Sequence, residues 1–447
     1  MRAVWRLSHW WMLLLLGLVS VWLLADLFKP GVFASHDGEV HMARMVQFFQ
    51  ALSEGDLPVR WFRWWNGGWG YPAFVYAYHL PYFLTSGLLV IIRDPEVVFK
   101  AMMWLSLWLS GITFYLWAKR WVSPLAAGLG SVWYMAVPYR AADIYERGAM
   151  GEDLFFVLAP LLFLLPHWKT DKKSLALTSL IVAAALSTHA LTMLVFLIPW
   201  GLYWLLVKGR HDWRWWATIL GIGAALSSFA WLPIILEQRY INVDLSYYRI
   251  FADHFLSWQR LIYIPKLTLP PISGIHFGWG QLLATSCIPV WLWFKVIQKR
   301  QRYLAGFLLI VTIVALLLMT SVTSILWEHG LKIILFPWRF LTLTTFTTAM
   351  LAAIIFDHLS PSKRWIVGVG LIILVIYPSR HYWQGRNFHH YPDDYYLTYT
   401  DPKLLDAYYL PKGVTANLPN LKPRLEILRG LGKGEVTSQT NSQLVAQ

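Results

Sequence analysis

Long apolar segments recur along the chain and are separated by short polar connections. Each is near the ~20 residues that cross a bilayer as a helix. Eleven such spans are expected, at about residues 10–28, 98–118, 123–138, 152–168, 174–190, 191–207, 214–236, 280–298, 303–320, 339–358 and 364–379. The pattern predicts an all-α polytopic membrane protein, because open sheets and irregular backbone cannot satisfy their polar groups in lipid.

Two apolar segments have a second interpretation. Residues 10–28 could be a signal peptide, since VFAS offers a small-residue cleavage site. A retained first span is favoured because the run is long and its flanks match the pattern downstream. Residues 81–92 are too short to cross and predict a re-entrant or interfacial helix inside a long first loop, residues 29–97.

Charge gives the expected orientation. The chain carries a net charge of +14 with only 14% charged residues, so the basicity indicates topology rather than a nucleic-acid partner. With the N-terminus in the cytoplasm, the inner connections are all short and basic: 119–120, 169–173, 208–214, 295–302 and 363–364. Of the 24 acidic residues, the inner segments hold only Asp171, Asp212 and Asp357. Any chemistry is therefore expected on the extracytoplasmic face.

The domain organisation follows from this topology. We expect a transmembrane domain over residues 1–379, a short extracytoplasmic segment over 380–430 and a disordered polar tail over 431–447. Cys287 is the single cysteine, which excludes an intrachain disulfide and a cysteine-based zinc site.

The first loop contains the stretch HDGEVHMARMVQFFQALSEGDLPVRW. An apolar stripe predicts an amphipathic helix along the membrane surface, formed by Val40, Ala43, Val46, Phe49 and Leu52. Asp37 precedes this helix and His41 follows one turn later, so both could face one point. The alternative is structural, with Asp37 as the helix N-cap and Glu39 in the first turn.

A second outer stretch, PYRAADIYERGAMGED, places mixed charge between two spans. Its charged residues are Arg140, Asp143, Glu146, Arg147, Glu152 and Asp153. This pattern is typical of a solvated hairpin. It would also suit a polar floor on which carboxylates and arginines meet a phosphate.

Three further outer features are candidates. His189 lies near the outer end of its span and is either functional or a hydrogen-bonded structural histidine. Arg339, in ILFPWRFLTL, could snorkel to headgroups or hold a lipid phosphate. The stretch at residues 61–83 combines tryptophans and glycines with Arg63 and Tyr71, which suits a sugar or headgroup as well as an ordinary aromatic belt.

Together these stretches resemble a known family. The first loop, GGWGYPAFVYAYHLPYFL, the YERGAMGED turn, THAL, FPWRF and a tail with YYLP are similar to bacterial membrane proteins called "6-pyruvoyl-tetrahydropterin synthase-related", over about residues 10–415. Nothing in the sequence resembles the soluble pterin enzyme. These membrane proteins in turn resemble the GT-C superfamily of glycosyltransferases, through topology and acid placement.

The resemblance implies a function. It implies inverting transfer of a sugar from a polyprenyl-phosphate-linked donor to a glycan, lipid or protein acceptor, on the outer face of the bacterial inner membrane. The family's catalytic base in the first outer loop corresponds to Asp37, and a second acid in a following loop corresponds to Glu146. Some superfamily members hold a divalent cation, Mg²⁺ or Mn²⁺, which would here fall to Asp37 and Glu146. Glu146 would therefore either orient the acceptor or hold this metal.

The substrate-binding set is expected around these two acids. It comprises Glu39, His41, Arg63, Tyr71, Arg147, Glu152, His189 and Arg339. Arg147 and Arg339 would hold the donor phosphate, and the lipid tail would lie in a groove between spans. The family often carries a larger outer domain after the last span, whereas this chain has only a short segment there.

Two other classes of function stay open. A lipid or glycan transporter or flippase would place ionisable groups and broken helices near the midplane, and no expected span has a charge at mid-depth. A non-catalytic membrane scaffold would bind a lipid or a partner without turnover.

Overall fold

The computed structural model describes residues 2–63, 65, 70–241, 247–261, 274–392, 395–397, 399, 412, 436–439 and 444–446 of the 447-residue chain. The α-helices are α1 (Arg2–Leu23), α2 (Gly38–Ser53), α3 (Ala73–Tyr76), α4 (Leu80–Ile92), α5 (Pro95–Ala118), α6 (Pro124–Ala136), α7 (Pro138–Ala141), α8 (Met150–Leu164), α9 (Lys172–Lys208), α10 (Trp213–Leu226), α11 (Ser228–Glu237), α12 (Trp258–Leu261), α13 (Trp279–Trp293), α14 (Lys299–Leu318), α15 (Ser324–His329), α16 (Phe340–His358) and α17 (Pro361–Ser379). A π-helix, η2 (Ala142–Arg147), and a 3-10 helix, η8 (Leu331–Ile334), also contribute to the site. Two short strands, β1 (Val436–Gln439) and β2 (Leu444–Ala446), pair antiparallel. The expected polar tail lies outside the described residues, apart from these strands.

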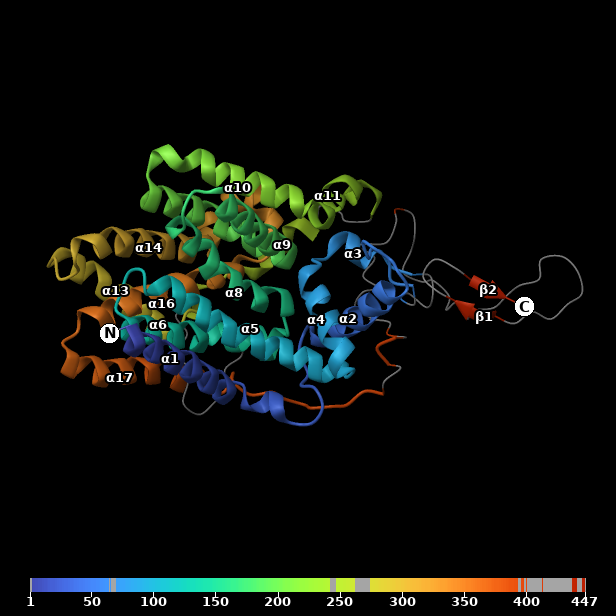
Figure 1. The fold of residues 1–447 in the computed structure, drawn as a ribbon, viewed down its shortest axis with the longest axis horizontal. Coiled ribbons are helices and arrows are strands. Elements are labelled where there is room, and N and C mark those ends of the chain that lie inside the picture. Colours follow the sequence, from blue (N-terminus) through green and yellow to red (C-terminus); the bar gives the residue numbers. More distant parts are fainter. Residues whose placement is uncertain are drawn as a thin grey trace, which may run out of the picture.

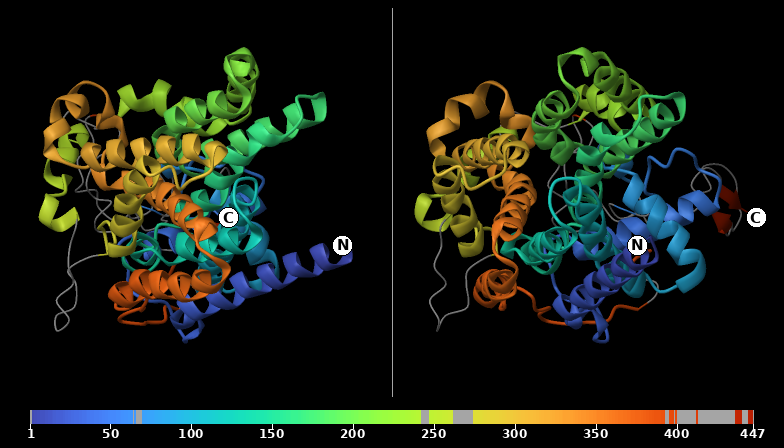
Figure 2. Two further views of the ribbon diagram at one scale, coloured as in Figure 1. Left: turned by 90° about the vertical axis from the view of Figure 1, so that its left-hand side faces the viewer. Right: turned by 60° about the vertical axis from the view of Figure 1, so that its left-hand side comes forward.

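The long helices lie side by side, and the first loop covers one end of the bundle. In Figure 1, α2, α3 and α4 lie together at the right, while the N-terminus of α1 lies at the opposite end. In every view α10 and α11 form one edge of the bundle, and α1 and α17 form the other (Figures 1 and 2). The bundle is held by α5 against α8 and α6, and by α16 against α14 and α6.

The all-α membrane architecture is confirmed, but eleven separate spans are not. Among the described residues, six helices are long and apolar enough to cross a membrane, or seven if one bent pair counts as a span. Three predicted spans correspond to shorter apolar helices: the apolar part of α1, Trp10–Leu23, α6 with 13 residues and α13 with 15. Of these, α6 is buried among its neighbours, so its ends need not reach the lipid surfaces.

α9 accounts for two predicted spans, because the chain folds back at His189. This residue has φ −160° and ψ 86°, outside the helical region. A straight helix of 37 residues would be about 55 Å long. Yet Lys208 Nζ, at its end, donates to the carbonyl oxygen of Trp168, just before its start, at 3.1 Å. The predicted spans 174–190 and 191–207 are therefore two antiparallel halves with His189 at the tip.

The span predicted at 214–236 is bent rather than straight. Its two parts, α10 and α11, meet at an angle of 74° around Ser227. The Ser227 hydroxyl donates to the carbonyl oxygens of Gly223 and Ala224 at 2.9 and 3.2 Å. This side chain competes with the helical hydrogen bonds at the bend, a recognised cause of helix kinks.

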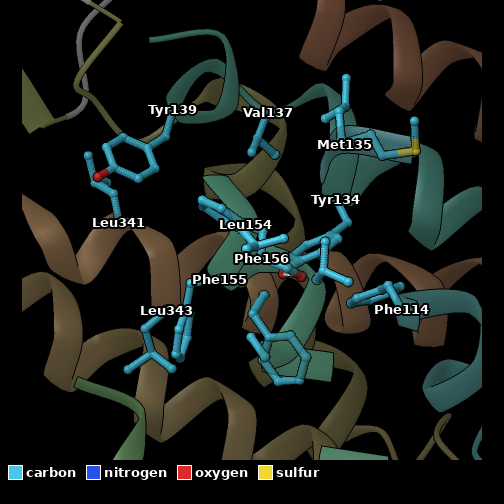
Figure 3. Close-up of a cluster of buried hydrophobic side chains, with 14 of the residues drawn as sticks. Phe114, Tyr134, Met135, Val137, Tyr139, Leu154, Phe155, Phe156, Leu341 and Leu343 are labelled. Carbon is cyan, nitrogen blue, oxygen red and sulfur yellow. Dashed lines mark hydrogen bonds between the residues drawn. The ribbon is translucent and has the colours of Figure 1, made fainter. Parts of the chain in front are cut away.

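Helix α16 runs through the centre of the protein. Every residue from Phe340 to Phe356 is buried, although five are threonines. Four of the five hydroxyls donate hydrogen bonds, three of them within α16, as in the bond from Thr348 Oγ1 to the carbonyl oxygen of Thr344 at 2.7 Å. Figure 3 shows the apolar cluster between α16, α8 and α6, in which Tyr139 lies beside Leu341.

The basic connections predicted to be cytoplasmic gather together. Arg300 Nη2 donates to the carbonyl oxygen of Arg120 at 3.1 Å, and Arg364 Nη2 donates to that of Asp357 at 2.7 Å. Gln301 Nε2 links the two groups through the Asp357 carboxylate at 3.0 Å. The outer loop lies at the opposite end of the spans. Which end faces the cytoplasm stays a prediction.

The helix predicted within the first loop forms where the sequence predicts it, but the face that it buries differs from the predicted apolar stripe. α2 ends at Ser53, in agreement with the pattern. The buried side chains include His41, Met42, Met45 and Phe48, whereas Val46 and Phe49 of the predicted stripe are only half-buried. The reason is that α2 packs against α4 and α5, so it buries a wider face than a helix lying on lipid would.

Candidate active site

A two-rung backbone ladder joins the first loop to the charged turn. The N–H of His36 donates to the carbonyl oxygen of Glu146 at 2.9 Å, and the N–H of Asp37 donates to that of Arg147 at 2.8 Å. We call these four residues the ladder. It brings together two stretches that are more than a hundred residues apart in the sequence.

Asp37 does not cap α2. The residue occupies the N-cap position, but its side chain accepts no hydrogen bond there. Ser35 Oγ takes this role and accepts from the N–H of Gly38 at 3.2 Å. The Asp37 side chain is exposed and lines a cavity instead. The purely structural interpretation of Asp37 is therefore wrong.

Two glycines of the YERGAMGED turn permit this close approach. Gly148 has φ +66°, and a Cβ on it would lie 2.9 Å from the backbone nitrogen of Gly38. A Cβ on Gly151 would lie 2.4 Å from the ring of Tyr78. Both distances are shorter than van der Waals contact, so any larger residue would push the turn away from α2.

A cavity of about 520 Å³ opens beside the ladder. It brings together six of the ten expected site residues: Asp37, His41, Arg147, Glu152, His189 and Arg339. We call it the first cavity. These residues come from α2, η2, α8, the tip of α9 and the start of α16, so the tertiary fold assembles the site from five places in the sequence.

Arg147 and Glu152 form a buried network on the cavity floor. Arg147 Nη1 donates to Glu152 Oε2 at 2.7 Å and also contacts Asp143. Glu152 Oε1 accepts from Tyr139 and Thr342 at 2.6 and 2.7 Å. The alternative of a solvated hairpin is therefore wrong, because these side chains are almost entirely removed from water.

One guanidinium is thus shared by two buried carboxyl groups. Burial and the neighbouring negative charge of Glu152 raise the pKa of Asp143 well above its usual range. Asp143 Oδ2 is buried and has no hydrogen-bond partner within the described part of the chain. Asp143 therefore holds its proton more readily than an ordinary aspartate, and Glu152 is the charged partner of Arg147.

His41 is a neutral histidine inside the cavity wall. Its Nδ1 lies 2.7 Å from the Tyr82 hydroxyl and its Nε2 lies 3.3 Å from the Tyr78 hydroxyl. Burial, with Arg44 and Arg147 nearby, lowers its pKa well below the ordinary value. The imidazole therefore exchanges hydrogen bonds with two phenols rather than adding charge to the site.

His189 has a structural and a cavity-facing role. Its Nδ1 accepts from the backbone N–H of Thr192 at 3.2 Å, which caps the second half of α9. Because Nδ1 is an acceptor, the neutral ring carries its proton on Nε2. The histidine therefore presents an N–H donor to the cavity.

The remaining arginines give the cavity an excess of positive charge. Arg44 and Arg339 line it together with Arg147. Arg339 is 7% exposed and donates to the carbonyl oxygen of Ile334, so it does not snorkel to solvent. Against these three guanidiniums the cavity wall holds two acidic side chains, Asp37 and Glu152.

The opposite wall of the first cavity is apolar. It is made by the tip of α9, by α11 and by η8 and its flank: Leu186, Ala190, Leu191, Ala230, Trp231, Ile234, Ile333 and Leu335. The cavity thus combines the three arginines with an apolar wall, which begins near the bend between α10 and α11.

Four expected residues lie elsewhere. Glu146 faces a second cavity, where its Oε2 accepts from the N–H of Gly274 at 3.0 Å. Glu39 accepts from the hydroxyl of Tyr395, on the far side of α2. Arg63 and Tyr71 do not line either cavity, and Tyr71 is 1% exposed.

Sequence reasoning missed Arg44, Tyr78 and His36, which all line the first cavity. A signal for Arg44 was present, since Asp37, His41 and Arg44 follow the i, i+4, i+7 spacing of one helix face. Tyr78 lies in the connection between α3 and α4, whose position depends on tertiary packing, and no local pattern places it.

The residues do not fit a resident divalent cation. The two acids proposed as ligands, Asp37 and Glu146, line different cavities. The oxygens of Glu152 are taken by Arg147, Tyr139 and Thr342. The described ranges contain no group of three or more His, Cys, Asp or Glu side chains placed to bind a metal. Arginines occupy the place where a cation would be needed.

A family profile matches most of the chain. Its description is "6-pyruvoyl-tetrahydropterin synthase related domain; membrane protein", and it covers residues 74–384. The profile therefore includes the charged turn, α9 and the start of α16. No curated protein matches the sequence significantly.

Among the solved structures that match are ArnT, in complex with undecaprenyl phosphate, and an oligosaccharyltransferase. ArnT from Cupriavidus metallidurans bound to undecaprenyl phosphate is 16% identical, with a TM-score of 0.45, over 83% of this chain and 63% of that chain. The apo oligosaccharyltransferase of Archaeoglobus fulgidus is 13% identical, with a TM-score of 0.47, over 89% and 57%. The chain thus spans less than two thirds of the length of each.

Proposed function

The chain belongs to the family of membrane proteins described as 6-pyruvoyl-tetrahydropterin synthase related, and from this premise we propose that it is a glycosyltransferase. It moves a sugar from a polyprenyl-phosphate-linked donor to an acceptor on the extracytoplasmic face of the bacterial inner membrane. Asp37 is the general base, as the GT-C resemblance of its loop implies.

One observation carries this proposal. Asp37 has an exposed carboxylate that does not cap α2, and this carboxylate shares a cavity with three guanidiniums and an apolar wall. A lipid-linked sugar phosphate needs each of these parts, since its anionic phosphate joins the reacting anomeric carbon of the sugar to an apolar lipid tail. A structural role for Asp37 leaves this arrangement unexplained.

The chemical step can be written from these groups. The acceptor oxygen attacks the anomeric carbon, and its proton passes to the Asp37 carboxylate. The bond between the anomeric carbon and the phosphate oxygen breaks, and the electron pair stays on the phosphate. The products are an inverted glycoside and polyprenyl phosphate. A base placed in this way typically contributes ~10²–10⁴ in rate.

The arginines supply the electrophilic assistance. Arg44, Arg147 and Arg339 bind the phosphate and stabilise the negative charge that grows on it as the leaving group departs. Glu152 holds Arg147 in place through its 2.7 Å bond and does not touch the substrate. His189 presents its Nε2–H to the same phosphate. The polyprenyl chain follows the apolar wall between α9 and α11.

The test is turnover with purified protein in lipid nanodiscs. A panel of polyprenyl-phosphate sugars is offered together with a glycan extract, and polyprenyl phosphate and labelled glycan are measured. Release of polyprenyl phosphate with appearance of labelled glycan is the expected result. Binding of the donors without any release would contradict the proposal.

A lipid flippase is the second candidate, and the bend between α10 and α11 favours it. Broken helices beside a cavity are typical of transporters, and the 74° break lies at the apolar wall. Sealed proteoliposomes containing a fluorescent polyprenyl phosphate distinguish the two. A flippase would equilibrate the lipid between leaflets without releasing sugar. Donor binding without turnover or lipid movement would indicate a lipid-binding scaffold.

A further inference from the structure

A second cavity, of about 400 Å³, adjoins the ladder. The ladder residues line different cavities. Asp37 and Arg147 line the first cavity, and Glu146 lines the second. His36 lines both. Asp37, the proposed base, is thus adjacent in the sequence to His36, which lines the second cavity.

The segment after the last span makes the outer wall of this cavity. Residues 381–387 run back across the start of the first loop, where the N–H of Ala34 donates to the carbonyl oxygen of Arg386 at 3.0 Å. Val32 and His389 exchange two backbone hydrogen bonds, at 2.8 and 3.0 Å. This pairing fixes the segment at the mouth of the cavity.

The lining of the second cavity is polar. Glu146, His381, Arg386 and Asn387 contribute donors and acceptors, and among the described residues that line it the aliphatic side chains are two alanines. Glu146 Oε2 accepts from the N–H of Gly274 at 3.0 Å, and among the described residues no other hydrogen bond to this carboxylate is seen, so its second oxygen can accept one from a ligand. Arg386 and Asn387 are exposed, so they are reachable from outside.

This chemistry selects one class of ligand. A lipid chain needs a wall of large aliphatic side chains such as that of the first cavity, and the described residues that line the second cavity include no leucine, isoleucine or valine. A hydroxyl-rich sugar needs several planar donors and acceptors beside aromatic rings, which Tyr145 and Tyr382 add here. The volume is within the range of small-molecule pockets.

We propose that the second cavity binds the acceptor as a sugar, with Glu146 and Arg386 holding its hydroxyl groups. The proposal rests on the glycosyltransferase function, and it gives Glu146 an acceptor-binding role in place of metal binding. The attacking hydroxyl reaches the anomeric carbon past His36, at the point where Asp37 can take its proton. The segment after α17 thus supplies acceptor contacts.

The test uses the full chain in nanodiscs and two defined probes, methyl α-D-mannopyranoside and the methyl glycoside of N-acetylglucosamine. Saturation-transfer NMR measures their binding. Glu146→Gln keeps an oxygen for Gly274, and Arg386→Met keeps the backbone contact to Ala34, so both variants should fold. Loss of a charged hydrogen bond predicts about tenfold weaker sugar binding in each.

Two controls separate this inference from the proposed function. Arg380→Met changes an arginine of the same segment that donates to Tyr377 and lines neither cavity. Arg44→Gln weakens polyprenyl phosphate binding in the first cavity. Both should bind sugar as the wild type does. Absence of sugar binding in wild type, or equal binding in the Glu146 and Arg386 variants, would overturn the inference. Sugar binding without transfer from any donor would overturn only the proposed function.

Discussion

The backbone N–H of Asp37 donates to the carbonyl oxygen of Arg147 at 2.8 Å. This bond ties the position of the proposed base to that of a phosphate-binding arginine. It depends on backbone atoms alone, so substitution of either side chain leaves it in place. The bond therefore allows the chemistry of each side chain to be tested separately from the architecture of the site.

The approach of the turn to α2 should depend on Gly148. In Gly148→Ala the new Cβ meets the backbone of Gly38 and the residue must hold φ +66°, so we expect a loss of about 3 kcal/mol in stability and a displaced Asp37. Gly55→Ala is the matched control, because Gly55 has φ +91° with nothing within 4 Å of its Cβ position. Thermal unfolding and donor turnover are measured for both. Equal effects of the two substitutions would show that the close approach is unimportant.

Arg44 should contribute to phosphate affinity. Removing its charge in Arg44→Gln should weaken polyprenyl phosphate binding by about tenfold or more, since hydrogen bonds to charged groups are worth about 1.5–3 kcal/mol. Arg239→Gln is the control, because Arg239 is exposed and contacts only Tyr240 among the described contacts. Binding to nanodisc-embedded protein is measured by native mass spectrometry. The same loss in both variants would indicate a general charge effect.

Replacing the two buried carboxyl groups of the network, Asp143 and Glu152, by amides should lower the stability of the protein by different amounts. Asn is isosteric with a protonated aspartic acid, so Asp143→Asn should change stability by less than about 1 kcal/mol. Gln at position 152 must turn its NH₂ group towards Arg147 or towards Tyr139 and Thr342, which are all donors. Glu152→Gln should therefore cost on the order of 3 kcal/mol. Thermal unfolding compares the two, and a larger loss in the Asp143 variant would reverse the assignment of charge.

His41 predicts a specific pH dependence of stability. Its folded pKa is below the ordinary 6.5, so the unfolded chain binds the proton first and stability falls as pH drops below about 6.5. The loss attributable to His41 between pH 7.5 and pH 5.5 should be on the order of 1 kcal/mol. Unfolding of wild type and His41→Gln is compared at pH 7.5 and 5.5.

Two other buried histidines, His79 and His276, should also lower the stability of the protein in acid. Burial lowers the pKa of both His79 and His276 to about 4. The wild type should therefore lose stability in acid even without His41, and the difference from His41→Gln isolates one residue. An identical acid loss in both proteins would mean that His41 is not held neutral by the fold.

The sequence predicts what depends on local pattern or bulk charge. The helical nature of the chain and the extent of α2 agree with the structure, and the break predicted between residues 190 and 191 lies at His189. The angle between two helices is not encoded in hydropathy, so the bend at Ser227 was not predicted. Helix α6 forms inside the range predicted for a span, 123–138, but has only 13 residues.

The site was predicted where charge is unusual for its surroundings. Arg147, Glu152, His189 and Arg339 are costly inside an apolar bundle, and the structure places them in one cavity. Glu146 and Arg147 are neighbours in the sequence, but they line different cavities. Only the three-dimensional course of the π-helix decides this.

The most direct test of the account compares Asp37→Asn with Glu39→Gln in donor turnover. The two acids lie two residues apart, but only Asp37 lines the first cavity. The account predicts that Asp37→Asn binds polyprenyl phosphate normally and loses ~10²–10⁴ in kcat, whereas Glu39→Gln keeps most of its activity. Equal turnover of Asp37→Asn and wild type would contradict the assignment of Asp37 as the base.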